Sequence, residues 1–145
     1  MSEIKQGYKK TKVGIIPEDW DVVRLGKITN IGTGKTPLRT NNSFWHNGTV
    51  NWATTTEVNE KYITSTNEKI TQKTVEELKM KILPINTILL AMYGQGKTRG
   101  KVALLKIESA INQAFASINP NKNYSTNFIF NYLDNSYEKI RDLSH

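Results

Sequence analysis

Residues Thr87–Leu105 (TILLAMYGQGKTRGKVALL) decide the fold of this chain of 145 residues. Two apolar runs of strand length flank the segment 94–100, which contains three glycines. Short apolar runs on either side of a glycine-containing loop are typical of a β-hairpin. Glycine in such a loop permits a positive φ or a close approach of the backbone to a neighbour. We therefore expect two core strands joined by the loop 94–100.

The sequence outside the hairpin predicts two helices. Thr74 and Glu77 fit a capping box, in which a hydroxyl and a carboxylate satisfy free amides at a helix start, so a short helix is expected to run to about Lys81. Near the end of the chain, residues 125–127 (STN) can cap a second helix. Its apolar side chains recur near helical spacing and are expected to pack on a sheet: Ile129, Leu133, Ile140 and Leu143.

Four further segments are expected to be strands, and with the hairpin they set the fold class. They are Trp20–Leu25, Val50–Ala53, Tyr62–Thr64 and Ala114–Ile118. The expected fold is α+β: a single compact domain over residues 1–145, with a mixed, mainly antiparallel twisted sheet, a few short helices and the C-terminal helix packed on the sheet. Residues 1–15 are expected to form a flexible N-terminal segment.

Positive charge is concentrated in two windows that contain no acid. The formal net charge of the chain is +7 at pH 7. Residues 22–56 hold four cations and residues 78–107 hold six, with no aspartate or glutamate in either window. Basic loops keep many small proteins soluble, but two long acid-free windows in one chain favour a surface that binds a polyanion.

Residues Ala91–Thr98 have the spacing A-x-x-x-x-G-K-T, a relaxed form of the phosphate-binding loop of nucleotide hydrolases. In such a loop the Gly-Lys-Thr opens a helix, and the N-terminus of that helix faces the phosphate. The residues that follow here, Arg99–Leu105, indicate a turn and a strand. A nucleotide-binding enzyme is therefore the weaker alternative, and it would require measurable ATP turnover.

The five-residue pattern G-x-G-K-T occurs twice, at Gly32–Thr36 and at Gly94–Thr98, once in each acid-free window. Chance recurrence of two glycine turns stays open as an alternative, because glycine and lysine are common in surface loops. If both segments reach the same side of the fold, their amides, lysines and threonines would bind phosphates as a pair. Contacts of this kind supply affinity and register but no sequence information.

The same windows supply candidate residues for binding duplex DNA. The candidates for phosphate contacts are Lys35, Thr36, Arg39, Lys97, Thr98 and Lys101. The candidates for reading base edges in the major groove are Asn51, Thr54, Thr55, Gln95 and Arg99. Among these, Arg99 has a planar fork that can pair with guanine through two hydrogen bonds, although the same fork also suits a phosphate or a carboxylate.

The residue inventory argues against several function classes. The chain has no cysteine and two histidines, so thiolate chemistry is excluded and no metal site is expected. No methyl-donor site or aromatic Pro-Pro signature of a DNA methyltransferase is visible, and we expect no catalysis. An RNA-binding module stays open on charge alone, but the aromatic motif of an RNA-recognition sheet is not visible. No apolar run approaches the ~20 residues of a membrane helix, so a cytoplasmic protein is expected.

The segment Ile16–Gly26 (IPEDWDVVRLG) resembles the opening of target-recognition domains in type I restriction-modification specificity subunits. Three later pieces resemble the same family: Gly34–Pro37 (GKTP), Val50–Thr55 (VNWATT) and, above all, Tyr93–Leu105, which is followed by Asn112–Ala114 (NQA). Each piece is short, but their order and spacing extend through nearly the whole chain, which makes the resemblance specific.

The resemblance implies a function that composition alone does not reach. Members of this family are non-catalytic and use two recognition domains, each of which reads one half of a split duplex DNA target. Long paired helices separate the domains and dock methyltransferase subunits, which supply S-adenosylmethionine chemistry, and a motor subunit consumes ATP with Mg. We therefore expect no cofactor bound by this chain itself. The sequence departs from the family by stopping at residues 141–145, where the first spacer helix is expected, and it lacks a second domain; we expect either a fragment or a half that a partner completes.

Overall fold

The computed structural model describes residues 4–143 and has the expected α+β fold, with two main sheets in place of one. The larger sheet has the strand order β3-β10-β7-β8-β5, in which only β8 and β5 pair in parallel. Its strands are β3 (Thr29–Thr33), β5 (Tyr62–Ile63), β7 (Ile88–Ala91), β8 (Val102–Leu105) and β10 (Phe115–Pro120). The smaller sheet contains β4 (Val50–Ala53), β6 (Glu68–Ile70) and β9 (Ala110–Ile111).

The predicted hairpin forms the centre of the larger sheet. Strands β7 and β8 pair antiparallel, with Leu89 opposite Ala103, and both strands are covered on both faces. One face packs Leu89 and Phe115 toward the smaller sheet, and the other packs Ile88 against the C-terminal helices. Strands covered on both faces read as continuous apolar runs, which explains why this stretch of sequence shows no alternation. The strands expected at 50–53, 62–64 and 114–118 are also confirmed, with small shifts at their ends.

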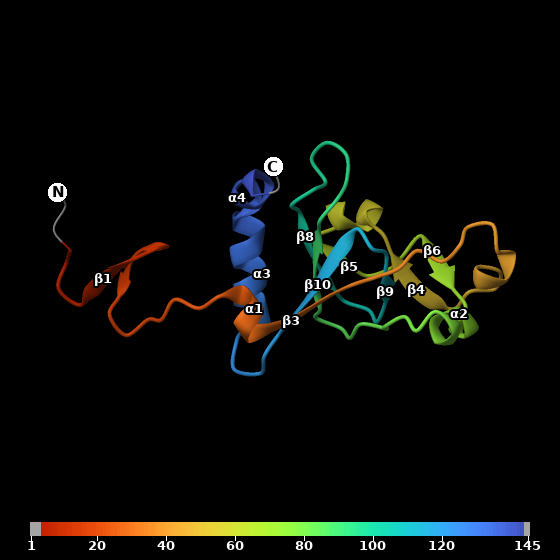
Figure 1. The fold of residues 1–145 in the computed structure, drawn as a ribbon, viewed down its shortest axis with the longest axis horizontal. Coiled ribbons are helices and arrows are strands. Elements are labelled where there is room, and N and C mark those ends of the chain that lie inside the picture. Colours follow the sequence, from red (N-terminus) through yellow and green to blue (C-terminus); the bar gives the residue numbers. More distant parts are fainter. Residues whose placement is uncertain (1–3, 144–145) are drawn as a thin grey trace.

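The C-terminal helix packs on the larger sheet as predicted, but it is divided in two. Helix α3 (Thr126–Asn135) is capped by the Ser125 hydroxyl, which accepts a hydrogen bond from the Phe128 amide at 3.2 Å. Figure 1 shows it upright against the sheet, with helix α4 (Tyr137–Asp142) above it. Between them the Ser136 hydroxyl donates to the Tyr132 carbonyl at 2.6 Å, a bond of the kind that bends helices. The expected packing of Leu143 is wrong, because its side chain is 84% exposed.

Helix α2 (Gln72–Glu77) begins before the predicted capping box and ends before Lys81. Its cap is Thr71, whose hydroxyl accepts a hydrogen bond from the Thr74 amide at 3.1 Å. Thr74 itself is fully buried and donates to the Phe44 carbonyl at 3.0 Å. Two threonines one helical turn apart offer the same cap chemistry, and burial decides between them. Two short 3-10 helices, η1 (Asn42–Phe44) and η2 (Thr55–Asn59), complete the middle of the chain.

The N-terminal region differs most from expectation. Strands β1 (Tyr8–Thr11) and β2 (Gly14–Pro17) form a hairpin where a flexible segment was expected, and Figure 1 shows this hairpin apart from the rest of the fold. Residues 1–3 of that segment lie outside the described residues. The strand predicted at Trp20–Leu25 is wrong: residues 20–24 are exposed and irregular and pair with none of the described strands, and Leu25 opens the short helix α1 (Leu25–Ile28).

Candidate functional site

The two G-x-G-K-T segments leave the larger sheet at the same end. Strands β3 and β7 flank β10 on opposite sides, and both run antiparallel to it. Their last residues therefore pair with the start of β10, Thr33 with Ala116 and Ala91 with Phe115. The turn that precedes β10 lies between the two exits, where the Met92 amide donates to the Ala114 carbonyl at 2.8 Å. The two exits are therefore neighbours, but Lys35 lines one cavity and Lys97 another, so binding of phosphates by the two segments as a pair stays a prediction.

The first segment, Gly32–Thr36, is extended chain and not a glycine turn. Gly34 lies so close to β9 that a Cβ at this position would be 1.9 Å from the Ile111 carbonyl oxygen. The neighbouring Lys35 amide donates to the same oxygen at 3.1 Å. Gly34 is therefore required for a close approach of two backbones, and the segment joins the larger sheet to β9 of the smaller one.

Side chains of the first segment also bond within the chain. The Lys35 ammonium donates to the Leu78 carbonyl at 2.7 Å, and the Thr36 hydroxyl donates to the Gln113 side-chain oxygen. Both residues remain exposed. An ammonium has three N–H donors, so Lys35 keeps two for an external acceptor.

The second segment, Gly94–Thr98, is a turn within the loop 92–101, which is exposed over residues 92–97. Gly94 has a φ of +154° and Gly96 a φ of +60°, and both values are costly for residues that carry a Cβ. The side chains of Gln95 and Lys97 are exposed and bond to no other described residue. These two are the candidate residues that the structure leaves most available to an external ligand.

The base of this loop is held by helix α4 through reciprocal hydrogen bonds. Arg99 Nη1 donates to the Arg141 carbonyl at 3.0 Å, and Arg141 Nη1 donates to the Arg99 carbonyl at 2.7 Å. The Tyr137 hydroxyl adds a third bond, to the Lys97 carbonyl at 2.5 Å. We refer to these bonds as the loop–helix contact. Because one Arg99 nitrogen is engaged here, the contact favours a positioning role for Arg99, and its base-reading role stays a prediction.

Arg39 bonds to an acid inside the chain. It forms an ion pair with Glu68, in which Nη2 and Oε2 are 3.1 Å apart, and its guanidinium lies 4.6 Å from the ring centre of Trp45 and 5.1 Å from that of Trp52. The hydrogen bond to Glu68 raises the pKa of Arg39 above its ordinary value. This arrangement favours a structural role over the predicted phosphate contact, and no sequence pattern connects two residues so far apart along the chain.

The remaining candidates for DNA contacts differ in how far their side chains are engaged in hydrogen bonds within the chain. Asn51 donates to the Glu108 carbonyl at 3.0 Å, and Thr54 caps η2 and donates to the buried Glu57 carboxylate at 2.9 Å. Lys101 donates to Asn59 Oδ1 at 2.8 Å. Thr55 and Thr98 are half-buried. Asn51 and Thr54 would have to exchange bonds within the chain for bonds to a base.

Sequence reasoning missed the residues that organise the two segments. Gln113 accepts from Thr36, Asn59 accepts from Lys101, and Tyr137 and Arg141 hold the loop. The sequence predicts a helix over the last two from the spacing of its apolar residues, which does not indicate what its polar face contacts.

Residues 17–145 match the family model for the "Type I restriction modification DNA specificity domain". The chain belongs to this family. The resemblance inferred from the motifs is thereby confirmed, and so is the expected fold class.

This specificity domain spans about a third of the length of its relatives. It is 31% identical over 143 residues to the type I restriction enzyme MjaIX specificity subunit of Methanocaldococcus jannaschii, covering 94% of this chain and 32% of that protein. It is 26% identical over 112 residues to the EcoR124I/EcoR124II specificity subunit of Escherichia coli, covering 75% of this chain and 27% of that protein.

Solved structures show the same fold at lower identity. The HsdS subunit from Thermoanaerobacter tengcongensis superposes with a TM-score of 0.65 at 15% identity, over 97% of this chain and 33% of that chain. The S subunit of a type I restriction-modification system from M. genitalium superposes with a TM-score of 0.57 at 14% identity, over 83% of this chain and 27% of that chain.

Residues Ala91–Thr98 do not have the strand–loop–helix geometry of a nucleotide-hydrolase loop. After Thr98 the chain turns at Arg99 and Gly100 and enters β8, so no helix starts at the Gly-Lys-Thr, as the sequence predicted. Within residues 4–143 no group of three or more acidic or histidine side chains is placed to hold a metal ion. Over the same residues no helix is long and apolar enough to cross a membrane.

Proposed function

We propose that this domain reads one half of a bipartite duplex DNA target, as the non-catalytic specificity component of a type I restriction-modification system. The observation that carries the proposal is the match of residues 17–145 to the DNA specificity-domain family. Support comes from the exit of both G-x-G-K-T segments at one end of the larger sheet. A surface with several free cations and few acids attracts the phosphate backbone, which supplies most of the affinity for DNA.

Within this function, the loop 92–101 makes the principal contacts. Lys97 binds a phosphate and Gln95 reads a base edge, because their side chains are exposed and bond to no other described residue. Additional phosphate contacts come from Lys35, Thr36, Thr98 and Lys101. Thr55 is a second base-reading candidate, whereas Asn51, Thr54 and Arg99 first have to leave their bonds within the chain.

The proposal also covers the partner subunits of this domain and the cellular location of the complex. Methyltransferase subunits and a motor subunit act with the specificity component, and S-adenosylmethionine, ATP and Mg belong to those subunits. Its target is duplex DNA, and we place the complex in the cytoplasm. A domain that reads one half-site binds it weakly when alone, because the second half of a split target contributes through a second domain.

Titration with labelled duplex DNA, single-stranded DNA, RNA and ATP on one preparation tests the proposal. We expect the chain to bind duplex DNA. The logarithm of the association constant should fall linearly with the logarithm of salt concentration, with a slope of about −0.9 per phosphate neutralised. Preference for single strands or RNA would favour an RNA-binding module, and saturable ATP binding would favour a nucleotide-binding enzyme. Duplex binding that is absent at low salt contradicts the proposal.

A further inference from the structure

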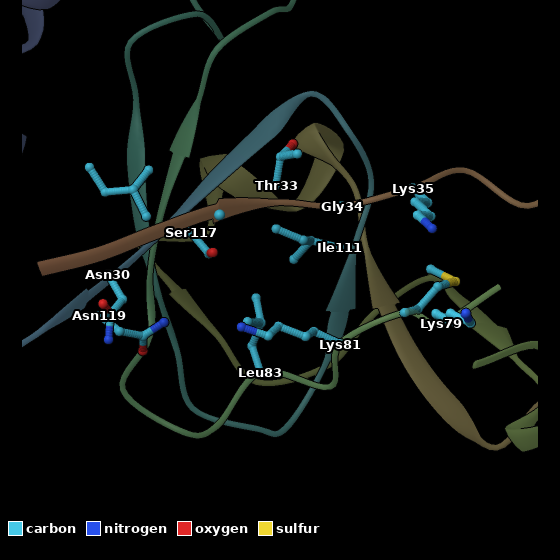
Figure 2. Close-up of a pocket in the computed structure, with 13 residues that line it drawn as sticks. Asn30, Thr33, Gly34, Lys35, Lys79, Lys81, Leu83, Ile111, Ser117 and Asn119 are labelled. Carbon is cyan, nitrogen blue, oxygen red and sulfur yellow. The ribbon is translucent and has the colours of Figure 1, made fainter. Parts of the chain in front are cut away.

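A cavity of about 300 Å³ lies between strands β3 and β10 and the chain that follows helix α2 (Figure 2). Its volume is at the lower end of small-molecule sites, which span roughly 300–1,000 Å³. Of its lining residues, the proposed function uses only Lys35. Its other polar lining residues are Asn30, Thr33, Lys79, Lys81, Ser117 and Asn119.

The cavity is lined by cations and by no acid. Lys35 comes from the first acid-free window, and Lys79 and Lys81 come from the second, so the fold brings the two windows together at this cavity. None of the three lysines forms a salt bridge with a described residue. Figure 2 shows the Lys81 side chain directed across the cavity toward Asn119, whereas Lys35 and Lys79 lie at the opposite end. Each end of the cavity therefore holds positive charge with no acid beside it, and an anion bound there would be attracted to that charge.

A second cavity shows that this arrangement is not general for lysines on the protein. It is lined by Lys61, Lys97 and Lys101 beside the loop 92–101, and it also contains an acid, Asp134. There Lys61 pairs with Asp134 at 3.1 Å, and Lys101 donates to Asn59. Two ammonium groups at that cavity therefore have partners within the chain, whereas those of Lys79 and Lys81 form no hydrogen bond or ion pair with a described residue.

The backbone at Lys79 gives an independent indication. Lys79 follows the C-terminal end of helix α2 and has a φ of +53°. Glycine is the usual residue at this position, because its missing Cβ removes the penalty of the left-handed conformation. Strained residues concentrate at ligand-binding sites, so a lysine in this conformation favours a role for its side chain in binding.

We propose that this cavity binds phosphate groups, with Lys81 and the Ser117 hydroxyl as ligands at one end and Lys79 and Lys35 as ligands at the other. The ligand is a phosphate group, whose oxygens accept hydrogen bonds from ammonium and hydroxyl donors. The phosphate group belongs either to the DNA backbone or to a free phosphorylated molecule. This inference goes beyond the proposed function, because binding of free phosphate does not depend on duplex recognition.

Titration of the isotope-labelled chain with inorganic phosphate, followed by NMR, tests the site directly. The chemical shifts of Lys79, Lys81 and Ser117 are expected to change and to reach a plateau as the phosphate concentration rises. Lys79→Gly should abolish the phosphate response at its own end of the cavity, read at Lys35, while leaving the denaturation midpoint equal to or above that of the wild type, since glycine suits the left-handed backbone. Lys81→Gln is the second variant, at a position where the structure records no positive φ. Lys122→Gln is the matched control, because it removes one charge from the exposed turn that follows β10, at a residue that does not line the cavity, and it should change nothing.

Duplex titrations of the same variants distinguish the two sources of phosphate. If the DNA backbone occupies the site, each of Lys79→Gly and Lys81→Gln lowers duplex affinity and reduces the salt slope by about one. If the source is a free molecule, both variants lose phosphate binding and keep duplex affinity. Failure of every variant and of the wild type to bind duplex would overturn the proposed function and leave the phosphate result standing.

Two results would overturn the phosphate site. One is a set of chemical-shift changes spread evenly over the exposed lysines, in which the resonances of Lys122 change as much as those of Lys79. The other is unperturbed Lys79, Lys81 and Ser117 resonances at millimolar phosphate in low salt.

Discussion

The segments Gly32–Thr36 and Gly94–Thr98 share the pattern G-x-G-K-T and leave one end of the same sheet, yet they have different physical roles. In the first, Gly34 is pressed against the Ile111 carbonyl of a neighbouring strand. In the second, Gly96 has open space around it and a φ of +60°. Glycine is needed for steric room in one segment and for backbone conformation in the other. A shared motif therefore predicts location and charge better than it predicts what each residue does.

The largest expected effect comes from Gly34→Ala. The added Cβ would be 1.9 Å from a backbone carbonyl oxygen that the sheet holds in place, so the strands must separate. We expect a loss of about 3 kcal/mol in the free energy of unfolding, the upper end of the usual range for overpacking. Urea denaturation followed by circular dichroism measures it.

Two other glycines complete this comparison. Gly96→Ala meets no atom within 4 Å and is expected to lose only about 1–2 kcal/mol, from its positive φ. Gly26→Ala, in helix α1 with no crowding and no positive φ, should be neutral or slightly stabilising. If Gly34→Ala costs no more than Gly26→Ala, the close contact of the two backbones is not real.

Arg99→Ala sharpens the contrast within the second segment. If Arg99 reads a base, selection from randomised duplexes should show relaxed choice at one position, at a cost of about 1–3 kcal/mol. If it acts only through the loop–helix contact, the affinity of the domain should fall by the same factor for every duplex sequence. Tyr137→Phe loosens the same contact and keeps the guanidinium, so it is the matched control. Unchanged binding by Arg99→Ala would remove this residue from the interface.

Lys97→Ala tests the free cation of the same loop. A phosphate contact carries no sequence information, so affinity for all duplexes should fall by a similar factor and the salt slope should decrease by about one. Neither the wild type nor the variant should bind ATP. Lys122→Gln controls for the loss of net charge. ATP binding in the wild type that disappears in Lys97→Ala would contradict the DNA-binding role.

What the sequence predicted well rests on local signals. The hairpin of Thr87–Leu105 and the Ser125 cap depend on residues close together along the chain, and both are confirmed. The strand expected at Trp20–Leu25 failed because a strand also needs a partner edge, which no local pattern reports. The pairing of Arg39 with Glu68 and the contact of Arg99 with Arg141 join distant parts of the chain, so they were beyond prediction from one sequence.

The smallest expected effect is that of Tyr137→Phe, and it separates the two segments by their dynamics. The change removes only the hydroxyl that donates to the Lys97 carbonyl, and it keeps the ring, over which the Arg141 guanidinium lies at 5.3 Å. A hydrogen bond of this kind contributes about 0.5–1.5 kcal/mol. Amide hydrogen exchange at Thr98 and Gly100 should therefore accelerate by up to roughly tenfold, since about 1.4 kcal/mol corresponds to that factor.

The Lys35 amide, which bonds to Ile111 in the first segment, should keep its exchange rate. Equal acceleration at Lys35 would mean that the variant destabilises the whole fold and that the two segments are not independent. No change at Thr98 or Gly100 would mean that the Tyr137 hydrogen bond does not help to hold the loop, which the two Arg99–Arg141 bonds then hold alone. With local acceleration confined to the loop, duplex affinity should fall slightly at all sequences, because binding must then order a segment that helix α4 holds in the wild type.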